Sequence, residues 1–188
     1  MNLPDPSEQV QTLYRGNWLT LRRRGNWEFV ERNQPGGAVI IIALTSARRL
    51  LLVEQYRVPM GCRTIEMPAG LIGDLEGHDG ENALTAARRE LEEETGYACE
   101  RVEFVHAGPS SAGMSTEMMV FVRAFGLHRT GPGGGDASEQ ITVHEIPLDQ
   151  AGAWLREKAR EGLSIDPKLF AGLWFLEHVP EPGGQSGS

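Results

Sequence analysis

The sequence predicts an α/β protein in which helices cover both faces of a mixed sheet, forming an α/β/α sandwich. Residues 38–44 are apolar at every position, as is typical of a central strand that is covered on both faces. Helical patterns occur at about residues 80–95, 148–161 and 166–177, separated by strand-like segments. Because helices flank the strands in the chain, helices are expected on both sides of the sheet.

A small antiparallel β element precedes this domain. Apolar and polar residues roughly alternate over residues 13–32, with a turn signal at Arg24-Gly25-Asn26, so two strands are expected. An isolated hairpin is marginally stable in water and needs a partner surface. We therefore divide the chain into an N-terminal β element (1–35), a main domain (36–179) and a flexible tail (180–188).

The remaining elements follow from strand patterns and helix end signals. Gly96 would end the first long helix, and Asp166-Pro167 reads as an N-cap followed by a proline at the first helical position. Tyr56 and Trp154 read as core residues. Further strands are expected at residues 50–55, 63–67, 98–108, 118–127 and 140–146.

Composition limits the function classes. The chain has 188 residues, 40% of them hydrophobic, and a net charge of −8, which argues against a nucleic-acid binder. The N-terminus lacks a signal-peptide pattern, and the longest apolar run is far shorter than a membrane span of about 20 residues. Cys62 and Cys99 lack metal-site spacing and read as two reduced thiols. A cytoplasmic protein with no membrane partner is expected.

The first long helix carries an unusually acidic run, with Glu90, Glu92, Glu93 and Glu94 inside five residues. Successive helical residues turn by about 100°. On this spacing Glu90 and Glu94 share a stripe beside the core, Glu93 lies just beyond it, and Glu92 points to solvent. Carboxylates so close together repel one another, and a divalent cation would neutralise them. The core stripe itself would consist of Leu84, Ala87 and Leu91.

The segment from Arg89 to Tyr97, with Glu81 eight residues before Arg89, resembles the second half of the Nudix hydrolase signature. Upstream, Glu66-Met-Pro-Ala-Gly70 resembles the start of that family's metal loop. One departure is clear. Gly70 and Glu81 are eleven positions apart, five more than in the family's spacing, so a longer and looser metal loop is expected. The resemblance implies the Nudix-type sandwich fold.

Other segments resemble the ADP-ribose pyrophosphatase subgroup, and together they cover about residues 13–178. Enzymes that cleave GDP-mannose share much of the same pattern. The subgroup resemblance implies a homodimer that pairs or exchanges its N-terminal sheets, with the substrate base between two subunits. The matching segments are 14–22, 27–31, 53–57, 66–70, 108–117 and 142–144.

The resemblance also implies a metal centre that uses Mg²⁺, with Mn²⁺ as a possible substitute. Its ligands would be the backbone carbonyl of Ala69 and the carboxylates of Glu90, Glu93 and Glu94, with Glu93 also counted among the catalytic residues. Arg89 would pair with these glutamates and hold their geometry.

The general base would come from the loop after the signature, where Glu117 occupies the matching place. Glu139, in a later loop that could close over the site, is the alternative base.

Arg57 would either hold a phosphate bidentately or form a salt bridge with Glu66, itself a candidate substrate residue. Trp27 and Phe29 would either stack on adenine or form part of a dimer core.

The expected reaction is Mg²⁺-dependent hydrolysis of ADP-ribose to AMP and ribose 5-phosphate. The same chemistry on another nucleoside diphosphate sugar, such as GDP-mannose, is the first alternative. A non-catalytic nucleotide sensor is the second, and only the loop insertion favours it, because all three metal-face glutamates are present.

Overall fold

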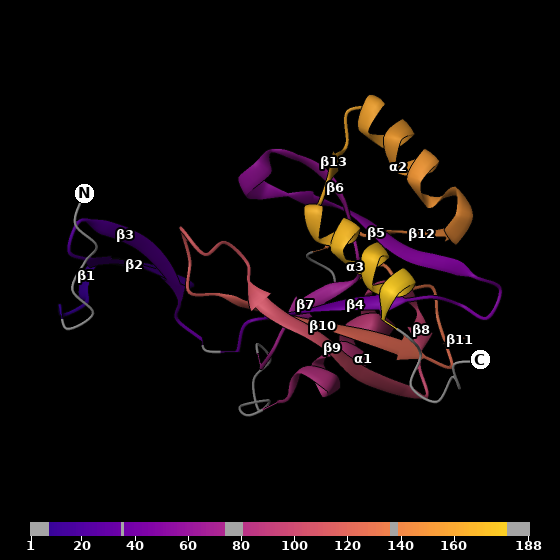
Figure 1. The fold of residues 1–188 in the computed structure, drawn as a ribbon, viewed down its shortest axis with the longest axis horizontal. Coiled ribbons are helices and arrows are strands. Elements are labelled where there is room, and N and C mark those ends of the chain that lie inside the picture. The colour runs from indigo at the N-terminus through magenta and orange to yellow at the C-terminus, as the bar shows by residue number, and fades with distance from the viewer. Residues whose placement is uncertain (1–7, 35, 74–80, 136–138, 180–188) are drawn as a thin grey trace.

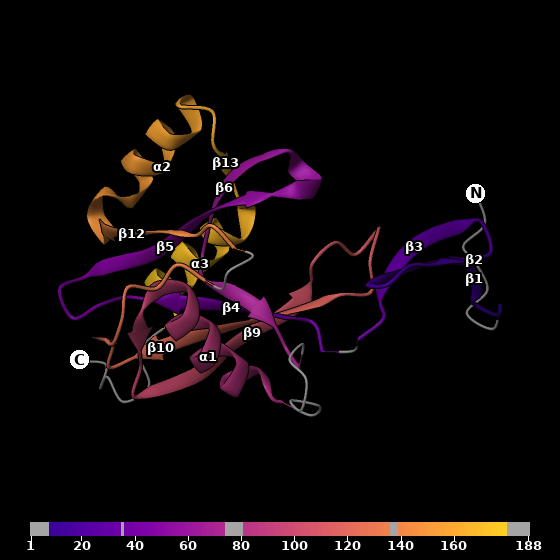
Figure 2. The ribbon, with the colours of Figure 1, turned by 180° about the vertical axis from the view of Figure 1, so that it is seen from behind.

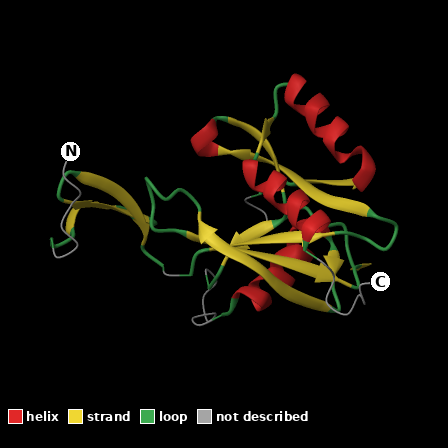
Figure 3. Ribbon diagram, viewed as in Figure 1, coloured by secondary structure: helices red, strands yellow, loops and turns green. Residues whose placement is uncertain are grey.

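The computed structural model describes residues 8–34, 36–73, 81–135 and 139–179, and within them the chain forms three α-helices and several sheets (Figures 1 and 3). The central sheet has the strand order β7-β4-β10-β9 and the second sheet the order β12-β5-β6-β13. A three-stranded sheet, β1-β2-β3, stands at the N-terminus, and β8 pairs with β11.

The bounds of the strands are β1 Gln11–Arg15, β2 Leu19–Arg24, β3 Trp27–Arg32, β4 Ala38–Ala43, β5 Arg49–Arg57, β6 Cys62–Glu66, β7 Ala69–Leu71, β8 Tyr97–Ala98, β9 Arg101–Pro109, β10 Met118–Phe125, β11 His128–Arg129, β12 Thr142–Pro147 and β13 Ser164–Ile165. The α-helices are α1 Ala83–Thr95, α2 Ala151–Arg160 and α3 Pro167–His178, and the short 3₁₀ helices are η1 Val58–Met60 and η2 Leu148–Gln150.

Strand β4 is the centre of the molecule. It pairs in parallel with β10 and antiparallel with β7. Alternate side chains enter two different cores: Val39 and Ile41 pack with α1, and Ile40 and Ile42 pack with residues of α2 and α3. Both faces of the strand are therefore buried, which is why its sequence is apolar at every position.

Helices lie on both sides of the central sheet, with α1 below it and α3 above it, between the two four-stranded sheets (Figures 1 and 2). Close packing of α3 depends on Gly172, where a Cβ atom would lie 2.2 Å from Cε of Met67. The predicted α/β/α arrangement with a mixed sheet is confirmed.

The N-terminal sheet projects sideways from the rest of the chain (Figures 1 and 2). The predicted turn after Arg24 joins β2 to β3, but a third strand, β1, adds to the expected two. All five residues of β1 are exposed, so no alternation of buried residues marked it in the sequence. The sheet contacts the main domain through β3, whose Val30 bridges to Ser115.

Two predicted core assignments are wrong. Leu84 lies in the first turn of α1 and is 38% exposed, because Ala86 and Ala87 face the core instead. Tyr56 is 54% exposed near the tip of the β5–β6 hairpin. Trp154 is half-buried against the core and His144. Of the expected looser loop at residues 71–80, positions 74–80 lie outside the described residues, and so does the expected flexible tail at 180–188.

Cys62 and Cys99 are both free thiols. None of the helices in the described part of the chain is long and apolar enough to cross a membrane.

Candidate active site

Helix α1 supplies the acidic side of the site. Asn82 caps its N-terminus by accepting hydrogen bonds from the backbone N–H groups of Leu84 and Thr85. At the other end Gly96 has a φ of 72°, which ends the helix in the left-handed conformation. The backbone N–H groups of Gly134 and Gly135 then donate to the carbonyl oxygens of Glu94 and Glu93, at 2.8 and 3.0 Å. The glycine-rich loop thus fixes the end of α1 that carries the carboxylates.

The four glutamates of α1 differ in solvent exposure according to the face of the helix on which they lie. Glu94 and Glu90 are buried, with 2% and 9% of their surface exposed. The side chain of Glu93 is 52% exposed, and Glu92 points to solvent. Two carboxylates are therefore enclosed, and a third stands at the edge of the site.

Arg89 forms ion pairs with several of the glutamates on this side of the pocket, which we call the acidic face of α1. Its guanidinium lies 2.8 Å from Glu90, 3.2 Å from Glu93 and 3.3 Å from Glu81. Partial burial alone would lower the pKa of Arg89, but the hydrogen bond that it donates to Glu81 and the charge of Glu90 raise that pKa above its ordinary value. The arginine is thus a permanent cation that holds the glutamate side chains in place.

Glu94 is a buried carboxyl group whose charged form is poorly compensated by its surroundings. Its carboxylate accepts a hydrogen bond from the backbone N–H of Ala69 at 3.0 Å. Burial raises the pKa of Glu94 well above the ordinary value, and the nearby charges of Glu90 and Glu139 add to this effect. The hydrogen bond from Ala69 acts in the opposite direction. Gly70 is needed beside this face, because a Cβ there would lie 1.9 Å from the carboxyl carbon of Glu90.

A divalent cation fits this donor set by charge and by chemistry. Hard carboxylate and carbonyl oxygens are the ligands that Mg²⁺ prefers, and the acidic face has more negative charge than Arg89 balances. Within the described residues, no three acidic, histidine or cysteine side chains are already arranged around one point. Since Arg89 holds Glu90 and Glu93 while Glu94 turns to Ala69, these carboxylates converge only in part.

Arg57 and Glu66 form the centre of the pocket wall. The guanidinium bonds both carboxylate oxygens, with distances of 2.7 and 2.8 Å, and Thr64 donates a further hydrogen bond to Glu66. Burial alone would raise the pKa of Glu66, but the bonds from Arg57 and Thr64 and the charge of Lys168 lower it. Arg57 therefore forms the salt bridge with Glu66 that was one of its two expected roles. Because Arg57 also lines the pocket, its guanidinium could in addition bind an anion there.

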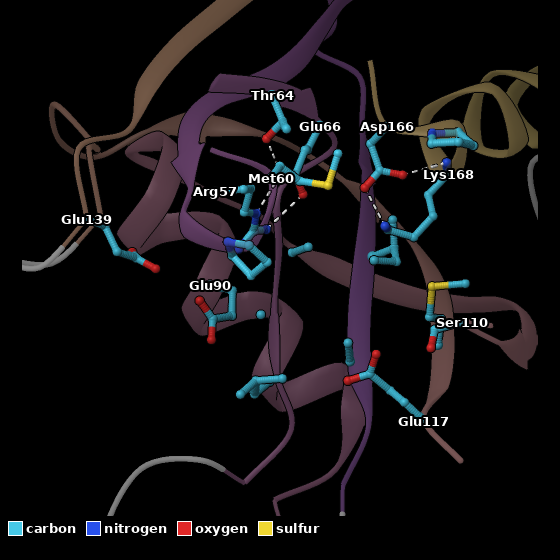
Figure 4. A pocket seen from close by; sticks show the side chains of 18 of the residues that line it. Arg57, Met60, Thr64, Glu66, Glu90, Ser110, Glu117, Glu139, Asp166 and Lys168 are labelled. Carbon is cyan, nitrogen blue, oxygen red and sulfur yellow. Dashed lines mark hydrogen bonds and ion pairs between the residues drawn. The ribbon is translucent and has the colours of Figure 1, made fainter. Parts of the chain in front are cut away.

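Arg57, Glu66, Arg89, Glu90 and Glu93 line one pocket with a volume of about 700 Å³, whereas the buried Glu94 is not among its lining residues. Figure 4 shows Glu90 and Glu139 on one side, Arg57 and Glu66 in the middle, and a second group of polar residues opposite. That second group, which we call the far wall, consists of Ser110, Glu117, Asp166 and Lys168. The pocket thus has an acidic half on α1 and a mixed polar half at the start of α3.

Both candidate bases line the same pocket, in different surroundings. Glu139 lies close enough to Glu94 to affect the pKa of that carboxylate. Glu117 forms an ion pair with Arg32, which is at the end of β3. The loop that carries Glu117 is further held by hydrogen bonds between Val30 and the backbone of Met114 and Thr116.

Trp27 and Phe29 do not line this pocket. They line a separate hollow of about 430 Å³ on the N-terminal sheet, together with Arg22 and Arg24. The indole N–H of Trp27 donates to the carbonyl of Gly113 at 3.3 Å. Within one chain, the aromatic candidates and the acidic face are therefore in different hollows.

Sequence reasoning missed Arg32, Asp166 and Lys168 as pocket residues. The sequence indicates only a helix cap at Asp166. Asp166 has this role, because it accepts a hydrogen bond from the Lys168 backbone N–H at 2.8 Å. The charged residue Lys168, two positions after the cap, could have suggested a binding site. The local sequence does not indicate which other residues lie opposite it.

Comparison with known proteins identifies the family. The model of the NUDIX domain matches residues 34–166, which is more than half of the chain. The chain belongs to the Nudix family. This confirms the resemblance in the segment from Arg89 to Tyr97, and the Nudix match extends from the end of the N-terminal sheet to the far wall.

Several known proteins are similar to this chain. A methanol dehydrogenase activator from Bacillus methanolicus is 37% identical over 123 residues, covering 65% of this chain and 64% of that protein. An ADP-sugar pyrophosphatase from Mus musculus is 36% identical, covering 69% and 60%. A GDP-mannose pyrophosphatase from Cronobacter sakazakii is 32% identical, covering 76% and 72%. The first two matches span less than two thirds of the relatives' own length.

The crystal structure of an ADP compounds hydrolase has the same Nudix fold. Its TM-score to this chain is 0.72, with 22% sequence identity, and the match covers 94% of this chain and 95% of that one. At this identity the likeness concerns the fold.

Proposed function

We propose that the protein hydrolyses the pyrophosphate bond of ADP-ribose, giving AMP and ribose 5-phosphate. The observation that carries the proposal is one pocket that combines the acidic face of α1 with the guanidinium of Arg57. A pyrophosphate needs such a site, because its oxygens gain negative charge as the bridging bond breaks. Relatives named as ADP-sugar and ADP-ribose pyrophosphatases support the choice of substrate.

Mg²⁺ would be held by Glu90, Glu93 and Glu94 and by the backbone carbonyl of Ala69, with Mn²⁺ as a possible substitute. When bound, the cation neutralises phosphate charge and makes the attacking water more acidic. Arg89 keeps the carboxylates in place, and Arg57 would orient the pyrophosphate by bidentate hydrogen bonds. In the reaction, water adds to one phosphorus, the bridging P–O bond breaks, and the water proton passes to a carboxylate.

Glu117 is the proposed general base, and Glu139 is the alternative. Glu117 stands on the far wall, in a loop that contains Gly113 and several serines and could move toward bound substrate. Its ion pair with Arg32 uses one carboxylate oxygen, and a carboxylate has further lone pairs that could accept a proton. Glu139 lies close enough to Glu94 for its charge to raise the pKa of that carboxyl, so it also suits a role near the cation.

The protein is also proposed to act as a homodimer. The N-terminal sheet leaves large side chains exposed, including Tyr14 at 68%, Trp18 at 72% and Trp27 at 51%. Covering such side chains is favourable, at roughly 25 cal/mol per Å² of apolar surface. A second copy that packs there would bring the hollow of Trp27 and Phe29 near a pocket, where the adenine could stack.

GDP-mannose is the main competing substrate, since relatives with that activity match over most of this chain. The test is a hydrolysis screen with Mg²⁺ over ADP-ribose, GDP-mannose, UDP-glucose, NADH, diadenosine polyphosphates and 8-oxo-dGTP, with products identified. Preferred release of AMP and ribose 5-phosphate supports the proposal. Faster cleavage of GDP-mannose would replace it, and cleavage of none would favour the nucleotide-sensor reading.

A further inference from the structure

The far wall contains an ion pair that the proposed chemistry does not use. Asp166 and Lys168 lie at the junction of β13 and α3, and their side chains contact each other in the pocket. The Asp166 side chain is 13% exposed and the Lys168 side chain 33%. In Figure 4 the pair lies across the pocket from Glu90 and Glu139, with Arg57 and Glu66 between them. It therefore faces the pocket away from the place proposed for the cation.

The hydrogen-bonding capacity of the pair is only partly used within the described residues. An ammonium group has three donors, and an ionised carboxylate has about four lone-pair sites. Asp166 takes one donor of Lys168 and accepts one backbone N–H. Donors and acceptors therefore remain side by side, which is the arrangement that matches neighbouring hydroxyl groups, because a hydroxyl both donates and accepts.

The surroundings favour a neutral polyol over a second phosphate. The pair has no net charge, and Glu117 on the same wall is itself paired with Arg32, so each cation of this wall is already balanced by a carboxylate. Apolar side chains of Ile40 and Met119 line the same pocket and could contact the C–H groups of a ring. A sugar offers both hydroxyl groups and an apolar ring surface.

We infer that the Asp166–Lys168 pair recognises the hydroxyl groups of the sugar attached to the distal phosphate, and so contributes to sugar specificity. Lys168 donates to one hydroxyl and Asp166 accepts from its neighbour. This inference rests on the proposed function for the position of the pyrophosphate, beside Arg57 and α1. It adds the part of the substrate that the far wall selects.

The experiment compares two substrates that share ADP but differ in the distal group. One is ADP-ribose, and the other is the ethyl ester of ADP, which has the same pyrophosphate without sugar hydroxyls. For Lys168→Met we expect kcat/KM for ADP-ribose to fall roughly tenfold to hundredfold, the usual effect of leaving a polar partner without its hydrogen bonds. The ethyl ester should change by less than about threefold, because it makes no contact with the pair.

Asp166→Asn gives a second, independent variant. Asparagine is as good an N-cap as aspartate, so α3 should remain intact while the charge is lost. It should show the same sugar-selective loss. Lys158→Met is the matched control, since Lys158 pairs with Glu161 on α2 and does not line the pocket, so both substrates should be cleaved at the normal rate.

Equal losses for both substrates would overturn the inference, because they would mean that Lys168 acts on the phosphates or on folding. No loss for either substrate would overturn it too. A wild-type protein that cleaves neither compound would instead reject the proposed function. In that case the dissociation constants of both compounds, measured by calorimetry without metal, test the same selectivity in wild type and in Lys168→Met.

Discussion

Replacing Glu94 by glutamine should stabilise the metal-free protein while it removes activity. Glu94 is 2% exposed, and burial together with Glu90 and Glu139 raises its pKa well above the ordinary value of 4.5. A buried charge costs several kcal/mol that a neutral side chain of the same shape avoids. Glutamine can still accept the hydrogen bond from the Ala69 backbone N–H.

The gain should be only part of that cost, because the new amide N–H groups need partners of their own. We expect about 1–3 kcal/mol at neutral pH, which for a chain of this size raises Tm by roughly 2–10 °C. The pH dependence has a definite sign. Because the folded pKa is raised, the folded protein holds the proton more tightly, so the wild type loses stability as pH rises from about 4.5 through the folded pKa. The difference between Glu94→Gln and wild type should therefore grow with pH.

Activity should change in the opposite direction. We expect kcat to fall at least about a hundredfold, which corresponds to roughly 3 kcal/mol of transition-state stabilisation. Glu92→Gln is the matched control, since it removes the same charge from the exposed side of α1 and should leave kcat nearly unchanged. Mg²⁺ should raise the Tm of the wild type and should raise the Tm of Glu94→Gln much less. A ligand stabilises a folded protein only to the extent that it binds, and the variant lacks one of the proposed ligands.

The assays are thermal unfolding with EDTA and with Mg²⁺ over a range of pH, and steady-state hydrolysis of ADP-ribose. A Glu94→Gln protein that is less stable than wild type without metal would refute the argument from buried charge. Equal losses of kcat in Glu94→Gln and Glu92→Gln would refute the assignment of the metal face.

Three further predictions follow from other contacts in the site. If Glu117 is the base, Glu117→Gln should slow single-turnover hydrolysis while KM and Mg²⁺ affinity stay near wild type, and a normal single-turnover rate would transfer the role to Glu139, to be tested by the same substitution. Deleting residues 1–35 should give a monomeric or insoluble, inactive protein in light scattering and activity assays, because it removes the exposed sheet and the support of Ser115 by Val30, and an active monomer would contradict this. Arg57→Met should cost about 1–2 kcal/mol at neutral pH, since it leaves Glu66 buried without its partner. Because the folded pKa of Glu66 is lowered, that difference in unfolding free energy should be full above pH 4.5 and shrink as pH falls through the folded pKa, and a constant difference would exclude the pair as its cause.

The amino-acid sequence is sufficient to predict the elements whose signals are local. The apolar run at β4 reports burial on both faces, and the spacing of glutamates along α1 orders Glu90, Glu93 and Glu94 by exposure, since helix geometry depends only on neighbouring residues. Caps at Asn82 and Asp166 act within three residues, and the Asp166 cap could be read directly. The Nudix resemblance in α1 is of the same local kind.

Which groups share the pocket depends on contacts between segments that are far apart in the sequence. The ion pair of Arg32 and Glu117 joins residues 85 positions apart, and the far-wall pair at Asp166 comes opposite Glu90 only because α3 packs against β4. On the opposite face of the sheet, the packing of α1 places Ala86 in the core and leaves Leu84 exposed. No periodicity in a single segment carries this information, because such contacts depend on how the sheets and helices close around a common core.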